Sequence, residues 1–395
     1  MIRKAAIYDP YLDTLGGGER YCLTVAEILL KHKYHVDLFW SGDSSLVKKA
    51  EKRFSLKINK LKVVEDIFGE KPRRLEFLES SENLLKFINR AINPQHVHFK
   101  FKNIVNKIKN TRKYDILFYL SDGSTPLIFA KKNFLHVQVP FAVKQRSFRQ
   151  IIDKPKMRFI SNVVCNSEFT ARFQKDIYKN KVLVLYPPVD VDKFKPSEKK
   201  ENIILSVGRF DNILNAKKQD VLIDVFKKLI KEEKINNWKL VLAGGSLSDP
   251  SKNLYLQHLQ KKSKKLPIDF LVNPSFEELQ RTYSKSKIYW HAAGFEVNED
   301  VHPENTEHFG ITVVESMASG LVPIVISKGG IPEIIDDGID GFLWNSIEEL
   351  VLKTRDLINS PDKLELMGKQ AILNCQRFSK ENFEKSLLSI FNINK

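Results

Sequence analysis

Short apolar runs alternate with longer amphipathic stretches from the start of the chain. Ala5–Tyr8 is an apolar run, a glycine-containing loop follows it, and apolar positions then recur at helical spacing from about Glu19 to Lys33. A second apolar run stands at Val36–Trp40. Buried runs separated by amphipathic helices are typical of a parallel sheet with helices between its strands. The pattern predicts the opening strand–helix–strand unit of a doubly wound sheet.

The alternation continues through the first half of the chain and then starts again. The polar segment Pro196–Asn202 reads as a linker, and the first helix after it is expected at Gln219–Lys231. A further helix is expected to begin at Gly329, after a short helix that follows Glu315 and ends near Gly320. Further strands are predicted, in chain order, at Ile116–Leu120, Phe134–Pro140, Val163–Ser167, Val182–Val189, Ile203–Arg209, Lys239–Gly245, Ile268–Leu271, Ile288–His291, Pro323–Ile326 and Gly341–Trp344.

The repeated pattern predicts an α/β protein with two Rossmann-like βαβ domains. The length of 395 residues agrees, because a single core rarely extends much beyond about 250 residues. We place the first domain at residues 1–195 and the second at residues 196–378. Residues 379–395 are expected to form a separate C-terminal helix, which is amphipathic and capped by Ser379.

Composition narrows the class of protein. No stretch approaches the roughly 18 apolar residues of a membrane span, and the apolar run near the N-terminus is too short for a signal peptide. The three cysteines, Cys22, Cys165 and Cys375, are too widely spaced for a disulfide framework or a zinc site. These features favour a cytoplasmic protein.

The chain carries a net charge of +16, and much of the excess is local. Between Lys86 and Lys113 there are eight basic residues and no acidic one, with Phe87, Phe99 and Phe101 interleaved. Such a region could face an anionic membrane, or it could be an ordinary solvated surface. A nucleic-acid-binding protein is a third hypothesis, but it rests on the net charge alone.

Three consecutive glycines, Gly16, Gly17 and Gly18, lie between the first predicted strand and its helix. Glycine lets the backbone approach a phosphate closely, and it also suits a plain tight turn. The G-x-G-x-x-G fingerprint is absent and no acidic residue ends the second strand, so an NAD site is unsupported. Two further candidates, Asp122 and His136, lie at or near strand ends, where open α/β sheets bind ligands, although a lone histidine is more often structural.

Two carboxylates, Glu307 and Glu315, stand eight residues apart around a predicted helix entrance. A helix entrance offers backbone N–H groups to a phosphate, and a carboxylate accepts hydrogen bonds from hydroxyl groups. A nucleotide sugar needs both. The alternative is a capping box in which Glu315 serves its own helix from Thr312. The residues between the carboxylates that would contribute to a ligand site are Phe309, Gly310, Ile311 and Thr312.

Basic side chains follow the first strand of the second half. Arg209 comes directly after it, and Lys217 and Lys218 precede the next helix. Arginine offers a rigid fork and lysine a mobile point charge, and both suit diphosphate oxygens. The sequence does not distinguish Lys217 from Lys218, and ordinary surface charge is the alternative for all three.

Together these segments resemble the GT-B fold glycosyltransferases of family 4, and they are most similar to the GDP-mannose-dependent α-mannosyltransferases of lipid-linked oligosaccharide assembly. The likeness covers nearly the whole chain. One departure is a long acidic loop between Trp290 and Glu307. The segments that carry the resemblance are Gly16-Gly17-Gly18, Ser121-Asp122-Gly123, His136, Asn166–Thr170, Tyr186–Asp190, Gly208-Arg209, Lys217, Tyr289–His291, Glu307–Glu315 and Gly329–Glu333.

The resemblance implies two domains that face each other across a cleft, with the donor held mainly by the second domain. Glu315 would hold the ribose hydroxyls and Glu307 would lie near the hydroxyls of the transferred sugar. Backbone N–H groups at 309–311 would meet the sugar and phosphate, and Arg209 and Lys217 would neutralise the diphosphate. From the first domain, the 16–18 loop would close over the donor and His136 would face the sugar. The C-terminal helix would cross back onto the first domain.

The implied reaction is the transfer of a hexose, with retention, from a nucleotide diphosphate sugar to a glycan or a polyprenyl-diphosphate-linked acceptor. GDP-mannose is the favoured donor and a UDP-sugar the second option. No metal and no cofactor beyond the substrate are expected, nor is a nucleic-acid partner. We further expect a peripheral position at an anionic membrane surface. A sugar-nucleotide epimerase of the same fold is the alternative function.

Overall fold

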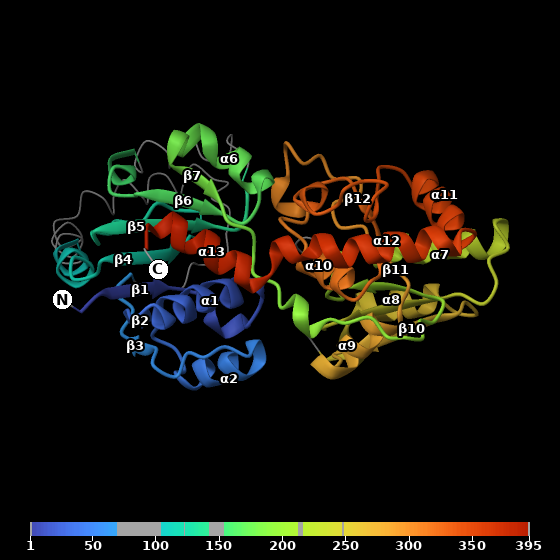
Figure 1. Ribbon diagram of the computed structural model, residues 1–395, viewed down its shortest axis with the longest axis horizontal. Coiled ribbons are helices and arrows are strands. Elements are labelled where there is room, and N and C mark those ends of the chain that lie inside the picture. The colour runs from blue at the N-terminus through green and yellow to red at the C-terminus, as the bar shows by residue number, and fades with distance from the viewer. Residues whose placement is uncertain are drawn as a thin grey trace. The chain divides into compact units, whose positions relative to one another are not determined.

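The computed structural model describes residues 2–68, 104–121, 123–141, 154–211, 216–246 and 249–393. They form two compact units (Figure 1). The first unit is built mainly from residues up to Val184, and the second from Leu185 onward together with Asn166–Phe173. Each unit is a parallel sheet with helices packed on it, so the predicted α/β class with two Rossmann-like domains is confirmed.

The first unit contains a seven-stranded sheet in the order β3-β2-β1-β4-β5-β6-β7, with every neighbouring pair parallel. The order runs outward in both directions from the β1–β4 pair, as in a Rossmann fold. Its strands are β1 (Lys4–Tyr8), β2 (His35–Phe39), β3 (Lys62–Val64), β4 (Ile116–Leu120), β5 (Lys132–Val137), β6 (Asn162–Cys165) and β7 (Val182–Val184).

Three named helices accompany this sheet: α1 (Gly17–Lys31), α2 (Ser45–Phe54) and α6 (Glu168–Tyr178). A further short helix spans 104–111. α1 buries its apolar stripe, which includes Tyr21, Val25 and Leu29. At the start of α6, Ser167 Oγ accepts a hydrogen bond from the Thr170 N–H at 3.0 Å and so caps the helix.

The second unit repeats the same order in six parallel strands, β10-β9-β8-β11-β12-β13. Its strands are β8 (Ile203–Val207), β9 (Lys239–Gly244), β10 (Ile268–Val272), β11 (Ile288–His291), β12 (Val322–Ile326) and β13 (Phe342–Trp344). Its helices are α7 (Gln219–Glu232), α8 (Leu254–Lys262), α9 (Phe276–Lys285), α10 (Ile311–Ala318), α11 (Ile347–Ile358), α12 (Pro361–Asn374) and α13 (Lys380–Phe391).

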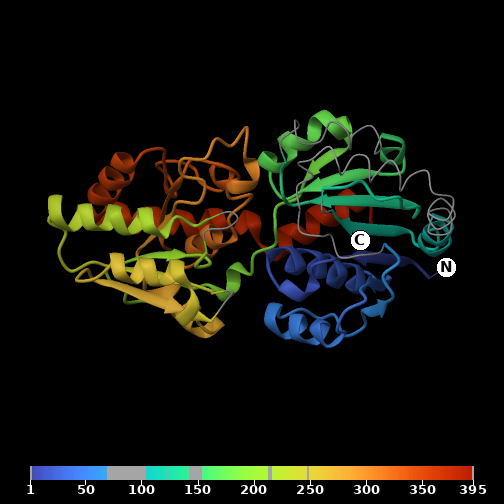
Figure 2. The same ribbon diagram turned by 180° about the vertical axis from the view of Figure 1, so that it is seen from behind.

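Alternate residues of these strands enter two apolar cores, one on each face of the second sheet. Ile204 and Leu240 pack with residues of α7, α8 and α11, whereas their neighbours Leu205 and Val241 pack with residues of α9 and α10. Figures 1 and 2 show these helices around the sheet from opposite sides. Because both faces are covered, the strands read as continuous apolar runs rather than alternating ones.

Some predicted elements are shorter than expected. The helix predicted from Gly329 is only a 3₁₀ turn at Ile331–Glu333, with Pro332 at its start. The strand predicted at 182–189 ends at Val184, ahead of Pro187 and Pro188, which cannot donate to a sheet ladder. The C-terminal helix is present as α13, and Ser379 Oγ accepts from the Asn382 N–H at 3.3 Å. The expectation that α13 crosses back to the first domain stays a prediction.

The three cysteines are buried, and none of them forms a disulfide. Within the described ranges, no helix is both long and apolar enough to cross a membrane.

Candidate functional site

The strand order of the second sheet reverses between β8 and β11, and candidate functional side chains lie at that point. Arg209 stands two residues beyond β8, and His291 is the last residue of the neighbouring strand β11. In doubly wound sheets, ligands bind outside the carboxyl ends of the strands at this switch of strand order. The topology therefore places both side chains where a ligand is expected. Arg209 was predicted as a site residue, and His291 was not.

A buried ionic cluster is centred on Glu307. Lys217 Nζ donates to Glu307 Oε2 at 2.6 Å, and His291 Nε2 lies 3.2 Å from the same oxygen. The side chains of Lys217 and Glu307 are 17% and 16% exposed, so the ion pair is largely screened from water. We call these three residues the Glu307 cluster. Its geometry leaves the other carboxylate oxygen, Oε1, without either of these contacts.

Electrostatics keep Glu307 ionised in this cluster. Burial alone would raise the pKa of Glu307, but Lys217 and His291 outweigh it and the pKa lies well below its usual range. Burial also lowers the pKa of His291, against the opposing pull of Glu307, so that ring is neutral at pH 7. The pair Lys217–Glu307 thus carries one positive and one negative charge.

Two glycines hold the backbone around Glu307. The Gly330 N–H donates to Glu307 O at 2.8 Å, and a Cβ on Gly329 would lie 2.1 Å from that same oxygen. A Cβ on Gly330 would lie 2.3 Å from His308 O. Gly329 also has φ +64°, which L side chains rarely adopt. The Gly329–Gly330 pair, predicted as a helix start, in fact packs its backbone directly against the backbone of Glu307 and His308.

α10 begins directly after this segment. Gly310 is its N-cap, with φ +114°, and no side chain caps the helix. The first N–H groups of the helix, at Ile311 and Thr312, therefore have no acceptor within it. The capping-box alternative is wrong, because Thr312 lies inside the helix and accepts from Tyr289 Oη at 2.8 Å through its hydroxyl. The α10 entrance is thus a set of N–H groups beside Glu307.

Glu315 lies one turn into α10 and is buried, with 9% of its surface exposed. Tyr283 Oη donates to Glu315 Oε2 at 3.2 Å. Burial, followed by the nearby Glu315 charge, raises the pKa of Tyr283 well above its usual value, so the phenol stays a hydrogen-bond donor. Glu315 is therefore an oriented carboxylate on the helix that carries the free N–H groups.

The structure separates the two adjacent lysines. Lys217 reaches Glu307, and Gly208 makes room for it, since a Cβ there would lie 2.5 Å from Lys217 Cγ. Lys218 is instead the N-cap of α7, in the left-handed conformation at φ +53°. Arg209 is half-exposed, and its Nε lies 3.4 Å from Asp211 Oδ2. Arg209 and Lys217 are thus the cations near the switch point.

The acidic loop before Glu307 is tied to the same support. Glu299 Oε2 accepts from the Gly329 N–H at 2.8 Å, and Lys328 Nζ donates to Val297 O. His308 Nε2 lies 3.3 Å from Glu304 O. The loop is therefore fixed against the glycines that position Glu307.

In the first unit, the glycine triplet lies at the start of α1, with Gly16 as its N-cap. Glu19 Oε2 accepts from the Gly16 N–H, so a phosphate at this helix entrance would compete with Glu19. The Cβ position of Gly18 is filled by Gln138, whose Oε1 would lie 2.6 Å from it. The loop is thus packed against the strand β5 segment.

His136 is fully buried in β5 and stacks on Tyr21 with ring centroids 4.0 Å apart. Its Nδ1 bonds to Val164 O at 2.9 Å, and its Nε2 accepts from Gln138 Nε2 at 2.9 Å. Burial lowers its pKa to about 4. A substrate could reach Nε2 only by displacing Gln138, and the expected contact with the donor sugar stays a prediction.

Pattern reading missed several residues. His291, Gln138 and Asp9 are not among the predicted site residues, although each lies at or just beyond a strand's carboxyl end, which is the signal that could have found them. Burial and the nearby Glu19 raise the pKa of Asp9 to about 8. Asp122 lies outside the described residues, as does 86–103 of the basic region; within 104–113, Arg112 and Lys113 are exposed.

The arrangement in the second unit suits an anionic ligand that also carries hydroxyl groups. Arg209, Lys217 and the α10 entrance can stabilise phosphate oxygens, and Glu307 and Glu315 can accept hydrogen bonds from hydroxyls. Among the described residues, no group of three or more His, Cys, Asp and Glu side chains is placed to hold a metal ion.

Two parallel sheets with repeated Rossmann order define the GT-B class of glycosyltransferase fold. A solved glycosyltransferase from Rickettsia africae ESF-5 aligns over 99% of this chain and 98% of its own, with a TM-score of 0.70 and 20% identity. Anabaena Alr3699/HepE, solved in complex with UDP and glucose, aligns over 99% of both chains with a TM-score of 0.66 and 17% identity.

Residues 189–373 match the family of glycosyl transferases group 1. Over 247 residues the chain is 28% identical to the GDP-Man:Man(3)GlcNAc(2)-PP-Dol alpha-1,2-mannosyltransferase of Xenopus laevis. That match covers 58% of this chain and 47% of the relative, so the chain spans about half the length of the curated relatives it matches. These matches confirm the resemblance to glycosyltransferases that the motifs carry.

Proposed function

We propose that the protein transfers mannose from GDP-mannose to a hydroxyl of a lipid-linked glycan, with retention of anomeric configuration and without a metal ion. The Glu307 cluster at the α10 entrance is the observation that carries the proposal. The choice of donor and acceptor is supported by the activity for which the similar Xenopus laevis protein is named. A UDP-sugar is the second option for the donor.

The proposed site holds the donor with residues of the second unit. The diphosphate would bind Arg209 and the N–H groups at the α10 entrance, and Lys217 would turn toward it from Glu307. The ribose hydroxyls would donate to Glu315 and the mannose hydroxyls to Glu307. Gly16–Gly18, His136, Asp122 and Lys218 are further candidates for donor contacts.

In the reaction, the bond from the anomeric carbon to the diphosphate oxygen breaks and a bond to the acceptor oxygen forms. The electron pair of the broken bond leaves with the diphosphate, where Arg209, Lys217 and the helix entrance stabilise the developing charge. A diphosphate oxygen would take the acceptor proton on the face from which it departs, which gives retention. This route requires no protein nucleophile beneath the sugar, and Glu307 would act only as an acceptor for the sugar hydroxyls.

The acceptor is proposed to be a polyprenyl-diphosphate-linked glycan, bound mainly by the first unit. Such an acceptor stays in a membrane, so the protein would work as a peripheral protein at an anionic surface. The 86–113 region is the sequence feature that supports this position.

A panel of nucleotide sugars in a thermal-shift assay tests the donor. GDP-mannose is expected to raise the melting temperature more than UDP-glucose or GDP-glucose, because a ligand at 100 times its Kd adds about 2.7 kcal/mol of stability. EDTA should leave that shift unchanged. A shift with UDP-sugars alone would replace the donor, and no shift with any nucleotide sugar would contradict the proposal.

A further inference from the structure

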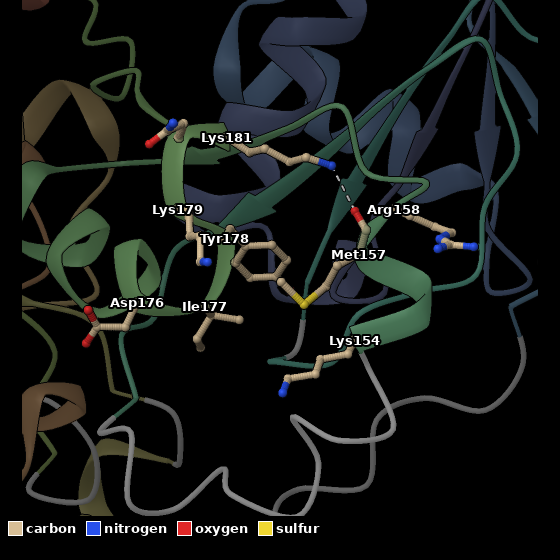
Figure 3. A pocket seen from close by; sticks show the side chains of 9 residues that line it. Lys154, Met157, Arg158, Asp176, Ile177, Tyr178, Lys179 and Lys181 are labelled. Carbon is tan, nitrogen blue, oxygen red and sulfur yellow. Dashed lines mark hydrogen bonds between the residues drawn. The ribbon is translucent and has the colours of Figure 1, made fainter.

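A cavity that is separate from the candidate donor site lies in the first unit, at the amino ends of β6 and β7 (Figure 3). It has a volume of about 730 Å³ and is bounded by the short helix at 154–157, the end of α6 and the turn before β7. It shares no residue with the candidate donor site, and it opens at the edge of the sheet opposite the carboxyl ends of the strands. We call it the amino-edge pocket.

The rim of the amino-edge pocket is cationic. Lys154, Arg158 and Lys179 are exposed, and within the described part of the chain none of their side chains has an ion-pair or hydrogen-bond partner. Asp176 is the one acidic residue among those that line the pocket. Three cations around one concave surface favour an anion, because no carboxylate among the described residues pairs with them.

Hydrogen bonds hold the wall of the amino-edge pocket in place. Lys181 Nζ donates to Ile160 O at 2.6 Å and to Met157 O at 3.0 Å, which leaves one of its three N–H groups for a ligand. Tyr178 is buried, and its hydroxyl is 2.6 Å from Thr125 Oγ1. Figure 3 shows Met157, Ile177 and Tyr178 between the surrounding basic side chains. An apolar wall under a cationic rim suits a phosphate that carries an organic group.

The surroundings extend this charge along the whole edge of the sheet. Because all seven strands are parallel, their amino ends share one edge, and an exposed Lys or Arg opens or precedes each strand, as do Arg3, Lys113 and Lys131. Lys131 is paired with Asp115 at 2.7 Å. Phe159, which is 39% exposed, lies beside Arg158 at the same edge, and its ring is tilted against that of Phe129 with the centroids 4.9 Å apart.

We propose that the amino-edge pocket binds a phosphate group, and that its source is the headgroup of an anionic phospholipid at a membrane surface. The unpaired cations supply the attraction, and the exposed Phe159 supplies an apolar contact with the interface. A basic edge with an exposed aromatic ring fits a lipid surface better than a free phosphate, which needs only the cations. The proposal stands on this pocket alone and does not depend on the donor site.

Vesicle sedimentation with the full chain tests it. The triple variant Lys154→Gln, Arg158→Gln, Lys179→Gln is compared with a matched control, Lys252→Gln, Lys261→Gln, Lys264→Gln, which removes three exposed and unpaired lysines of the second unit. Wild type and control should bind phosphatidylcholine vesicles that contain phosphatidylglycerol, and not pure phosphatidylcholine. The pocket variant should bind roughly 100-fold more weakly, since each cation near an anionic surface is worth about a factor of 5.

A thermal-shift series with inorganic phosphate separates the two sources. If phosphate stabilises the wild type but not the pocket variant, and no vesicle binds, the anion site stands and its lipid source is overturned. If the pocket variant binds anionic vesicles as the wild type does, or if both triple variants lose binding equally, the pocket is not the site and the proposal is overturned. Circular dichroism of both variants confirms that they are folded.

Discussion

Glu307 and Glu315 are both largely buried carboxylates of the second unit, but their hydrogen-bond partners differ. Glu307 is paired with Lys217 at 2.6 Å, whereas Glu315 accepts a longer hydrogen bond from the neutral phenol of Tyr283 at 3.2 Å. A cationic partner that can move to a phosphate leaves Glu307 responsive to the donor. Glu315, fixed on α10 beside neutral phenols, is a constant acceptor for hydroxyl groups.

Glu315→Ala is expected to weaken GDP binding by roughly 10- to 100-fold, which is the range for losing a hydrogen bond to a charged group. Isothermal titration of GDP into wild type and variant measures this loss. Glu348→Ala on α11 is a matched control, because that side chain is 69% exposed and outside the site. Equal GDP affinity for Glu315→Ala and wild type would show that Glu315 does not hold the nucleotide.

His136 provides a prediction on pH. Burial lowers its pKa to about 4, below the usual 6.5. Between these two pH values the ring is therefore protonated in the unfolded chain but neutral in the folded protein. The stability held by neutral His136 is complete above pH 6.5 and is lost as the pH falls toward 4, at about 1.4 kcal/mol per pH unit.

His136→Gln should remove this dependence. Between pH 7 and pH 4.5, the variant should lose roughly 2–3 kcal/mol less unfolding free energy than the wild type in urea titrations at each pH. His35→Gln, at the exposed start of β2, is the control and should behave as wild type. Parallel pH curves for His136→Gln and wild type would mean that His136 is already free to take a proton in the folded state.

At the scale of elements, most strands and the helices α1, α7 and α13 follow from periodicity, because each buries enough apolar residues to leave a pattern. β3 has only three residues, none of them fully buried, and α9 is short and polar on most of its surface, so neither left a clear signal. The 3₁₀ turn at Ile331–Glu333 was expected as a helix, since the sequence does not reveal that Gly329 and Gly330 pack against another backbone segment.

Gly329→Ala tests that backbone support. The added methyl would overlap Glu307 O at 2.1 Å, so we expect a loss of about 3 kcal/mol or more in unfolding free energy together with loss of nucleotide binding. Gly338→Ala is a matched control, because Gly338 also has a positive φ, +80°, but nothing lies within 4 Å of its Cβ position. The control should lose only about 1–2 kcal/mol, the cost of the left-handed conformation.

Both variants can be compared by urea denaturation. A similar loss for the two would mean that the strain is conformational only, and that the Glu307 segment tolerates movement of its support.

At the scale of the whole molecule, the fold class followed from the repeated βα pattern, but the membership of the site did not follow as fully. Glu307, Glu315 and Arg209 could be proposed because motifs mark them, and their roles stay predictions. Lys217 could not be separated from Lys218, since only the fold shows that Lys217 contacts Glu307 and that Lys218 is the N-cap of α7. His291 was missed because its role depends on which strands are neighbours, a property of topology rather than of local sequence.

The charge of the molecule shows the same limit. The net charge of +16 suggested an anionic partner, and the run at 86–113 was its visible part. The basic residues at the amino ends of the strands are scattered along the sequence and become one surface only when the strands align in parallel. Composition therefore predicts an anionic partner, whereas the alignment of the strands determines which surface carries the positive charge.

The most direct test of the central claim measures mannosyl transfer and GDP binding together. Wild type, Glu307→Gln and the exposed control Glu296→Gln are incubated with GDP-mannose and a polyprenyl-diphosphate-linked oligosaccharide, and mass spectrometry follows the addition of one hexose. We predict transfer by wild type and control. For Glu307→Gln we predict a rate that is lower by a factor of about 100 or more, with GDP affinity nearly unchanged. Transfer by Glu307→Gln at the wild-type rate, or no transfer by the wild type from any nucleotide sugar that it binds, would contradict the account.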